Sequence, residues 1–250
     1  MRLLVINPNT SESVTEKIAA VAREAAANGT EIECATAHRG VPYIATRAEA
    51  MIGGQMVLEI LAERADNFDA AIIAAFGDPG LGGARELFDI PIVGLAEASV
   101  LMACPLGRNF SIVSFSSRLE PWFRECIAWH GLTERLASIR MLDAPVSDVA
   151  GIQAAQADLL VELAERAINE DGAEVIILAG APLAGLSTLV RDRIAVPVVE
   201  GVAASIKVAE GLVALNPRKP TSGSFRQPIP KPATGLADAL SHLIETGRLK

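Results

Sequence analysis

A loop with the sequence NPNTS, at residues 7–11, carries the first side chains suited to binding a small molecule. It follows an apolar segment and precedes a predicted helix. Backbone N–H groups that are free at the start of a helix attract carboxylates and polarised carbonyls, and the side chains of Asn7, Asn9 and Thr10 add hydrogen-bonding groups. These three residues are candidate ligand contacts. The alternative is that the loop only caps the helix, which we expect the side chain of Ser11 to do.

A serine-rich loop at residues 114–117 stands in the same relation to a later apolar segment. Its candidate binding residues are Ser114, Ser116 and Ser117. Neither loop has the spacing of a phosphate-binding loop, GxxxxGK followed by Ser or Thr, and no GxGxxG follows a predicted strand. A GxSxG nucleophile elbow is also absent from the sequence. We therefore expect no nucleotide cofactor and no serine-hydrolase site of that type.

Two acidic residues are candidates for proton transfer. Asp78 lies in a Gly/Pro turn after the apolar run at 69–76, and Glu200 ends the apolar run at 196–200. A carboxylate at the carboxyl end of a parallel strand can reach a binding crevice and act as a general acid or base. The alternatives are structural, because Asp is common in turns and Glu200 could instead hold the neighbouring half of the chain.

Cysteine and histidine spacing argues against a metal centre or a catalytic thiol. The three cysteines, Cys34, Cys104 and Cys126, show no CxxC pattern, and the three histidines show neither HxH nor HExxH. Each cysteine falls inside a predicted strand or helix rather than at a strand's end, where a reactive thiol is expected. Three cysteines cannot all pair among themselves, which also suits a reducing cytoplasm. We predict no metal site.

The elements that must position these residues alternate between strand and helix. Strands are predicted at residues 3–7, 31–37, 69–76, 91–95, 110–115, 138–142, 175–179 and 196–200. Helices are predicted at residues 11–27, 47–65, 97–106, 118–130, 151–170 and 236–246, with short helices after the third and seventh strands. Continuous apolar strands between helices are typical of parallel sheets covered on both faces.

The second half of the chain repeats the pattern of the first. Val113 lies 107 residues after Ile6, Gly180 lies 105 after Ala75, and Pro197 lies 106 after Pro91. We therefore predict an α/β fold of two pseudo-symmetric lobes, each a four-stranded parallel βα sandwich. The first lobe spans 1–107 with about 202–250, and the second spans 108–201.

Four loops of this predicted arrangement meet at one crevice between the lobes. The loops at 7–11 and 114–117 face each other across it, as do those at 76–81 and 180–186. From the second pair, Phe76, Gly77 and Ala181 are added as candidate binding residues.

Composition and charge limit the classes of binding partner that we expect. The formal net charge is −8, half of the residues are hydrophobic, and no basic stripe appears, so nucleic acid is not expected. The longest apolar runs are about half the length of a membrane helix, and the N-terminus does not resemble a signal peptide. Residues 216–235 contain five prolines and predict an extended arm along the surface or a neighbouring subunit. A cytoplasmic homo-oligomer that binds a small molecule is expected.

Five segments resemble the aspartate/glutamate/hydantoin racemase superfamily, and within it the hydantoin and allantoin racemases. They are VINPNTS (5–11), AAFGDPGL (74–81), IVGLAEAS (92–99), GAPLAGL (180–186) and PVVEGVAAS (197–205). The resemblance covers roughly residues 1–215. It implies two pseudo-symmetric lobes, no cofactor, and a ureide, lactam or small acid bound between them.

Racemases of this family use two cysteines, one on each face of the substrate carbon, and the resemblance places them at Ala75 and Gly180. Neither residue can carry a proton, so the two-thiol mechanism is not expected here. Three hypotheses stay open. The protein racemises a hydantoin-like ureide or small acid with Asp78, Glu200 or a serine of 114–117; it catalyses hydrolysis or decarboxylation of a related molecule; or it binds such a molecule without turnover.

Overall fold

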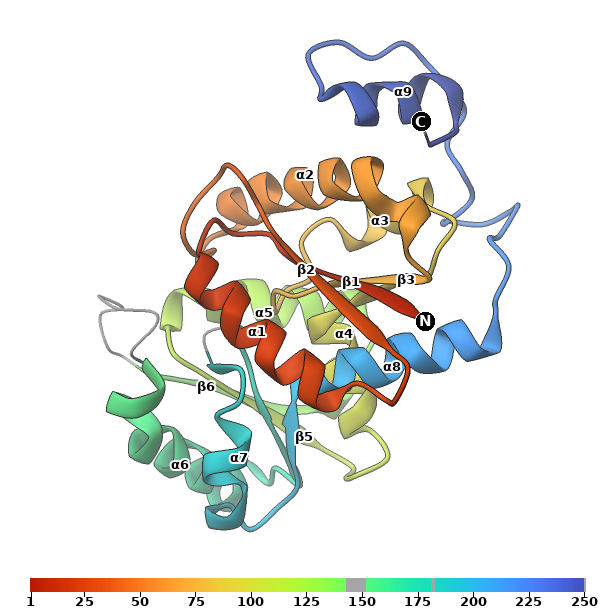
Figure 1. Ribbon diagram of the computed structural model, residues 1–250. Coiled ribbons are helices and arrows are strands. Elements are labelled where there is room, and N and C mark those ends of the chain that lie inside the picture. Colours follow the sequence, from red (N-terminus) through yellow and green to blue (C-terminus); the bar gives the residue numbers. More distant parts are fainter. Residues whose placement is uncertain (143–151, 181–182, 250) are drawn as a thin grey trace.

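Two four-stranded parallel sheets form the framework of the protein (Figure 1). The computed structural model describes residues 1–142, 152–180 and 183–249. The first sheet has the order β2-β1-β3-β4, with strands β1 (Arg2–Asn7), β2 (Glu31–Thr36), β3 (Ala70–Ile73) and β4 (Ile92–Gly94). The second has the order β6-β5-β7-β8, with strands β5 (Phe110–Ser114), β6 (Leu136–Met141), β7 (Val175–Leu178) and β8 (Val198–Glu200). The predicted α/β fold with two similar lobes is confirmed, and we name the lobes after these sheets.

Helices connect the strands and cover both sheets. They are α1 (Glu12–Ala25), α2 (Arg47–Arg64), α3 (Leu81–Leu87), α4 (Leu95–Ala103), α5 (Glu120–Trp129), α6 (Ile152–Asp171), α7 (Ser187–Val190), α8 (Gly201–Leu215) and α9 (Asp238–Thr246). Short 3-10 turns lie at Ala65–Asn67, Ser117–Leu119, Thr133–Arg135 and Arg191–Arg193. Most predicted helix ends lie within two residues of these bounds, which is the usual uncertainty of helix termini.

Two predictions of helix position need correction. Helix α4 begins at Leu95 and ends at Ala103, whereas the pattern predicted 97–106. It begins early because the side chain of Asp78 supplies acceptors for N–H groups of its first turn, a contact between residues far apart in sequence. Helix α8 was not predicted as an element. Its apolar residues extend to the exposed Leu215, so the sequence lacks a clear amphipathic stripe.

The hydrophobic core divides at the first sheet because strand residues alternate between its faces. Leu3 and Val5 of β1 join the larger cluster, which continues into the second lobe through residues such as Ile112. Leu4 and Ile6 point the other way and join a smaller cluster beneath α2, α3 and α9. The lobes therefore share one continuous core.

Helices α4 and α8 lie against each other where the lobes meet, with α8 on the face of the first sheet opposite α2 and α9 (Figure 1). The packing is close at Gly201. A Cβ atom there would lie 2.8 Å from Leu95 Cδ2 and 2.8 Å from Ser99 Oγ. Because α4 also contacts β7, β8 and α5 of the second lobe, packing of these helices sets the position of one lobe relative to the other.

Residues 216–237 form neither helix nor strand and lead to α9, which packs on α2. The Lys219 ammonium donates to the carbonyl oxygens of Arg85 and Phe88, both at 2.6 Å. The Arg85 guanidinium lies 5.7 Å from the centre of the Phe225 ring. These contacts hold the segment against the first lobe. None of the described helices is long and apolar enough to cross a membrane.

Candidate active site between the lobes

A small cavity of about 40 Å³ lies where the carboxyl ends of the two sheets approach each other. One residue from each of the four facing loops lines it, namely Asn9, Phe76, Phe115 and Gly180. Ala75, which follows β3, lines the same cavity. The residues at 75 and 180, one after the third strand of each lobe, thus border one space. The carboxyl edge of parallel sheets is the usual place for a ligand.

Aromatic rings form much of the cavity wall. Phe76 and Phe123 have ring centroids 4.7 Å apart, and Trp122 and Phe123 have centroids 5.9 Å apart. Tyr43 also borders the space, and among the described lining residues it alone has an ionisable side chain. A flat, partly polar ring suits walls of this kind.

Gly180 and Phe115 are in close approach. A Cβ atom on Gly180 would lie 2.5 Å from Phe115 Cε1, well inside contact distance, and Gly180 has φ of +115°. Both observations favour glycine at this position. The adjacent Ala181, a predicted binding residue, lies outside the described residues.

The NPNTS loop is held by an internal network. The buried Asn7 amide donates to Asn9 Oδ1 at 3.0 Å and to Thr15 Oγ1 at 2.9 Å. Asn9 Oδ1 also accepts from the Ser11 N–H at 2.9 Å. Asn9 is therefore the member that reaches the cavity, while Asn7 orients it. The half-buried Thr10 donates its N–H to Val41 O at 2.9 Å and is not among the described lining residues.

Ser11 does not cap α1 in the way predicted. It occupies the N-cap position, but its side chain makes no capping hydrogen bond. Its hydroxyl lies 3.1 Å from that of Ser13 instead. The side chain of Asn9 accepts a hydrogen bond from the Ser11 N–H and so helps to stabilise this turn.

The serine-rich loop contributes mainly through its phenylalanine. Ser114 is buried and donates its hydroxyl to Ala179 O at 2.7 Å, which ties β5 to the segment just before Gly180. Ser116 is half-buried and Ser117 is exposed. Phe115 lies between them in the sequence. It is the residue of this loop that belongs to the described lining of the small cavity.

Asp78 is buried with its carboxylate at the start of α4. It accepts from the N–H groups of Ala96 at 2.8 Å and Glu97 at 2.9 Å. Burial raises the pKa of Asp78, and hydrogen bonds from His130 and from the two backbone groups oppose that rise. The carboxylate borders a second, larger cavity of about 350 Å³ and is not among the described residues that line the first. Gly77 borders the same larger cavity.

Glu200 occupies a comparable position at the start of α8. Its carboxylate accepts from the Ala203 N–H at 2.6 Å, as an N-cap residue does. Burial raises the pKa of Glu200, opposed by hydrogen bonds from the backbone of Ala203 and Val202. Both predicted acidic residues thus hold helix starts, where free N–H groups attract a carboxylate.

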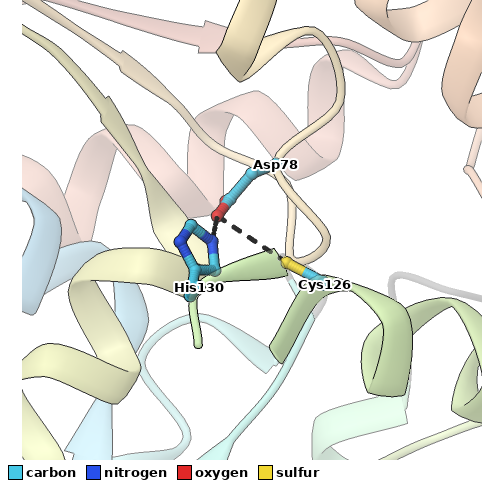
Figure 2. Close-up of side chains that lie close together, drawn as sticks. All are labelled: Asp78, Cys126 and His130. Atoms are coloured by element: carbon cyan, nitrogen blue, oxygen red, sulfur yellow. Dashed lines mark hydrogen bonds and ion pairs between the residues drawn. The ribbon is translucent and has the colours of Figure 1, made fainter. Parts of the chain in front are cut away.

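A cluster that sequence spacing did not reveal lies beside Asp78 (Figure 2). His130 Nε2 lies 3.1 Å from Asp78 Oδ2, and Cys126 Sγ lies 3.9 Å from the same oxygen. Burial, followed by the charges of Asp78 and Glu97, raises the pKa of the Cys126 thiol. Asp78 follows β3 of the first lobe, whereas Cys126 and His130 belong to α5 and its end in the second. No local sequence motif predicts a contact between residues so far apart in the sequence. These three side chains could hold a metal ion.

Similarity to known proteins extends over most of the chain. Residues 3–209 match the family model described as Asp/Glu/Hydantoin racemase. The chain is 39% identical to a hydantoin racemase of Paenarthrobacter aurescens, covering 92% of this chain and 99% of the relative. It is 32% identical to a hydantoin racemase of Pseudomonas sp. (strain NS671), covering 95% and 96% respectively.

Solved structures give a similar result. An allantoin racemase from Klebsiella pneumoniae superposes with a TM-score of 0.90 at 37% identity, covering 96% of this chain and 99% of that one. An allantoin racemase from Pseudomonas fluorescens superposes with a TM-score of 0.90 at 36% identity, covering 94% and 100%. The likeness therefore extends over both lobes.

Proposed function

The chain belongs to the Asp/Glu/hydantoin racemase family, and we propose that it interconverts the two enantiomers of a hydantoin-like cyclic ureide. One observation carries the proposal: sequence similarity to hydantoin racemases over nearly the full length of the chain accompanies a cavity bordered by Ala75 of one lobe and Gly180 of the other. The ring would lie in that cavity, with one lobe at each face.

The reaction requires proton transfer at both faces of one carbon. A base removes the proton of the ring carbon beside the carbonyl, leaving a carbanion stabilised as its enolate, and a proton returns from the opposite face. A single base would return the proton to the face it came from. The aromatic wall of Phe76, Trp122 and Phe123 suits a planar enolate, and the Asn9 amide offers a hydrogen bond to a ring carbonyl or N–H.

We propose a proton carrier other than the family's pair of thiols, because the resemblance places those thiols at Ala75 and Gly180, and neither residue has an ionisable side chain. Tyr43 would be the carrier at one face, removing the proton as a phenolate or returning it as a phenol. Water that enters alongside the ring would be the carrier at the other face, and exchange of one proton between Tyr43 and solvent would return the site to its starting state. Tyr43 is the ionisable side chain among the described lining residues. Asp78 and Glu200 act as positioning residues in this scheme, because their carboxylates hold the starts of α4 and α8.

Binding must enlarge the cavity. Sites for small molecules usually exceed about 300 Å³, whereas this one measures about 40 Å³. The ring of Phe115, which stands over Gly180, is the side chain that we expect to move. Rotation of an aromatic side chain on binding is common even where the backbone stays in place.

The proposal has two further parts. The protein transfers the proton without a cofactor, and it works as a homo-oligomer in the cytoplasm. The exposed apolar side chains of Leu215 and Ile229, at 77% and 82% exposure, support a neighbouring subunit along the arm. Light scattering after size-exclusion chromatography measures the assembly, and a single-chain mass would contradict it. Activity that survives exhaustive chelation and dialysis supports cofactor independence.

The experiment is isotope exchange. Enantiopure 5-substituted hydantoins and allantoin are incubated with the protein in deuterium oxide, and chirality and deuterium content are followed by chiral chromatography and proton NMR. We expect loss of enantiomeric excess together with deuterium uptake at the ring carbon. A blank without protein corrects for spontaneous exchange.

Tyr43→Phe tests the carrier, and Trp129→Phe, an exposed aromatic outside the first cavity, is its matched control. Loss of an acid–base group lowers the rate by about 10²- to 10⁴-fold, whereas the control should exchange at the wild-type rate. Exchange that survives Tyr43→Phe would remove Tyr43 from the mechanism. No exchange above the blank would contradict racemisation. In that case, opening of the ring would indicate a hydrolase, and release of carbon dioxide would indicate a decarboxylase. Thermal stabilisation by the ligand without turnover would indicate a binding protein.

A further inference from the structure

We propose that Asp78, Cys126 and His130 bind a zinc ion that joins the two lobes beside the cleft. The potential ligand atoms of the three side chains all lie within 4.8 Å of one another. Figure 2 shows the carboxylate of Asp78 directed toward both the imidazole and the thiol. The proposal is independent of the racemase activity, since none of the three residues is among the described lining of the first cavity.

The ligand set and its spacing suit zinc. Zinc binds thiolate sulfur, imidazole nitrogen and carboxylate oxygen at about 2.0–2.3 Å in tetrahedral geometry, which separates ligand atoms by roughly 3–4 Å. The observed separations from Asp78 Oδ2 are 3.1 Å to His130 Nε2 and 3.9 Å to Cys126 Sγ. Small side-chain rotations would therefore bring all three atoms to bonding distance.

A carboxylate lies behind the far ring nitrogen of His130. His130 Nδ1 lies 3.7 Å from Glu97 Oε1, and Arg85 binds the Glu97 carboxylate through two nitrogens. A carboxylate behind the far ring nitrogen is the usual partner of a metal-bound histidine, because it fixes the tautomer and the ring orientation. Here it leaves Nε2 directed toward Asp78.

Burial and charge both favour a cation at this point. The side chains of Asp78 and His130 are 2% and 5% exposed, and that of Glu97 is 15% exposed. The Arg85 guanidinium pairs with Glu97, whereas the Asp78 carboxylate is held by two backbone N–H groups and by His130. A divalent ion would compensate the negative charge that remains when His130 is neutral and acts as a ligand.

The fourth coordination position opens into a cavity. The cavity of about 350 Å³ is bordered by all three proposed ligands and by the indoles of Trp122 and Trp129. Three protein ligands with one open position leave room for water or for a small anionic ligand.

The site connects the lobes next to the proposed active site. Asp78 follows Phe76 by two residues, and Phe76 lines the first cavity. Cys126 and His130 come from the opposite lobe through α5, whose Trp122 borders both cavities. A bound ion would hold the 76–81 loop against α5 and so restrict opening of the cleft at this side.

Zinc binding is measured on the full chain after removal of metals by chelation. Titration against a chromophoric chelator should give one zinc per chain, and replacement by cobalt should give a thiolate-to-cobalt charge-transfer band. Cys126→Ser and His130→Asn should weaken zinc binding by more than about 100-fold, which is more than the loss of a residue that only supports a ligand usually causes. Cys104→Ser and His242→Asn, which lie outside the cluster, should bind zinc as the wild type does.

Thermal unfolding provides a second measurement, since an ion that binds only the folded chain raises Tm. Zinc should raise Tm of the wild type and of the Cys104→Ser control but not of Cys126→Ser. If Cys126→Ser or His130→Asn fails to fold, Glu97→Gln keeps all three ligands and should weaken zinc about 10- to 100-fold while retaining the cobalt band. Less than one equivalent of zinc, a cobalt spectrum without the thiolate band, or equal affinity in Cys126→Ser and Cys104→Ser would overturn the site.

Discussion

Phe115 occupies the space into which a side chain at position 180 would project. Its Cε1 atom lies 2.5 Å from the place of a Cβ atom on Gly180. The two residues come from the loops after β5 and β7, which Ser114 ties together through its bond to Ala179 O. A side chain at 180 therefore needs a different position of Phe115 as well as a different residue at 180.

Gly180→Cys should destabilise the protein, and Phe115→Ala should relieve part of the effect. The positive φ at 180 costs about 1–3 kcal/mol for a residue with a side chain, and the contact with Phe115 adds to it. Free energies of unfolding from urea titrations of both single variants and the double variant measure the coupling. Strictly additive effects would contradict the steric relationship.

Thiols at positions 75 and 180, where the family resemblance places its two cysteines, should require the same relief. Ala75 already has a Cβ atom and borders the cavity, so Ala75→Cys should change stability by less than about 1 kcal/mol. Deuterium exchange into a hydantoin should rise when Ala75→Cys, Gly180→Cys and Phe115→Ala are combined. The pair of cysteines without Phe115→Ala is the control. Equal exchange by both proteins would show that Phe115 does not obstruct the site.

Asp78→Asn separates a positioning role from acid–base catalysis. Asp78 has φ of +51°, a conformation that Asn also tolerates. The amide of Asn can accept only one of the two N–H groups that the carboxylate holds, so we expect a loss of roughly 1–3 kcal/mol in the free energy of unfolding. Exchange rates should fall far less than the 10²- to 10⁴-fold typical of a lost acid or base. Asp192→Asn, on an exposed side chain, controls for the change of charge.

Glu200→Gln should alter the pH dependence of stability. Because burial raises the pKa of Glu200, the native state binds this proton more tightly than the unfolded state does. That contribution is present below the unfolded pKa and is lost as pH rises through the folded pKa. Gln keeps an oxygen acceptor for the Ala203 N–H and avoids the ionised carboxylate. The variant should therefore gain stability relative to wild type as pH rises from acid to neutral.

Urea unfolding at several pH values measures this difference. A difference between Glu200→Gln and wild type that stays constant, or that moves against the variant as pH rises, would contradict the direction of the shift. Glu24→Gln, an exposed residue on α1, is a suitable comparison.

Leu243→Ala should show that α9 belongs to the fold of the first lobe. Leu243 is 2% exposed in the cluster beneath α2, and a buried Leu→Ala change typically costs 2–5 kcal/mol. Leu189→Ala, at a side chain 66% exposed, should cost less than about 0.5 kcal/mol. Thermal or urea unfolding measures both. Equal stability of the two variants would mean that α9 does not contribute to the core.

The sequence by itself determined the alternation of strands and helices, the duplication of the lobes and the loops that face the cleft. These features follow from local patterns: continuous apolar strands such as Ala70–Ile73 require burial on both faces, and matching Gly/Pro turns keep the two halves in register. It also identified the family, because the turn motifs around Ala75 and Gly180 are short and contiguous.

Only the tertiary structure decided where the side chains in those loops point. Asp78 and Glu200 face the starts of α4 and α8 because free N–H groups there bind a carboxylate. Asp78 meets Cys126 and His130 because packing brings α5 of one lobe onto a loop of the other. Phe115 covers Gly180 for the same reason. Contacts between lobes depend on how whole surfaces pack, and local sequence periodicity does not predict that packing.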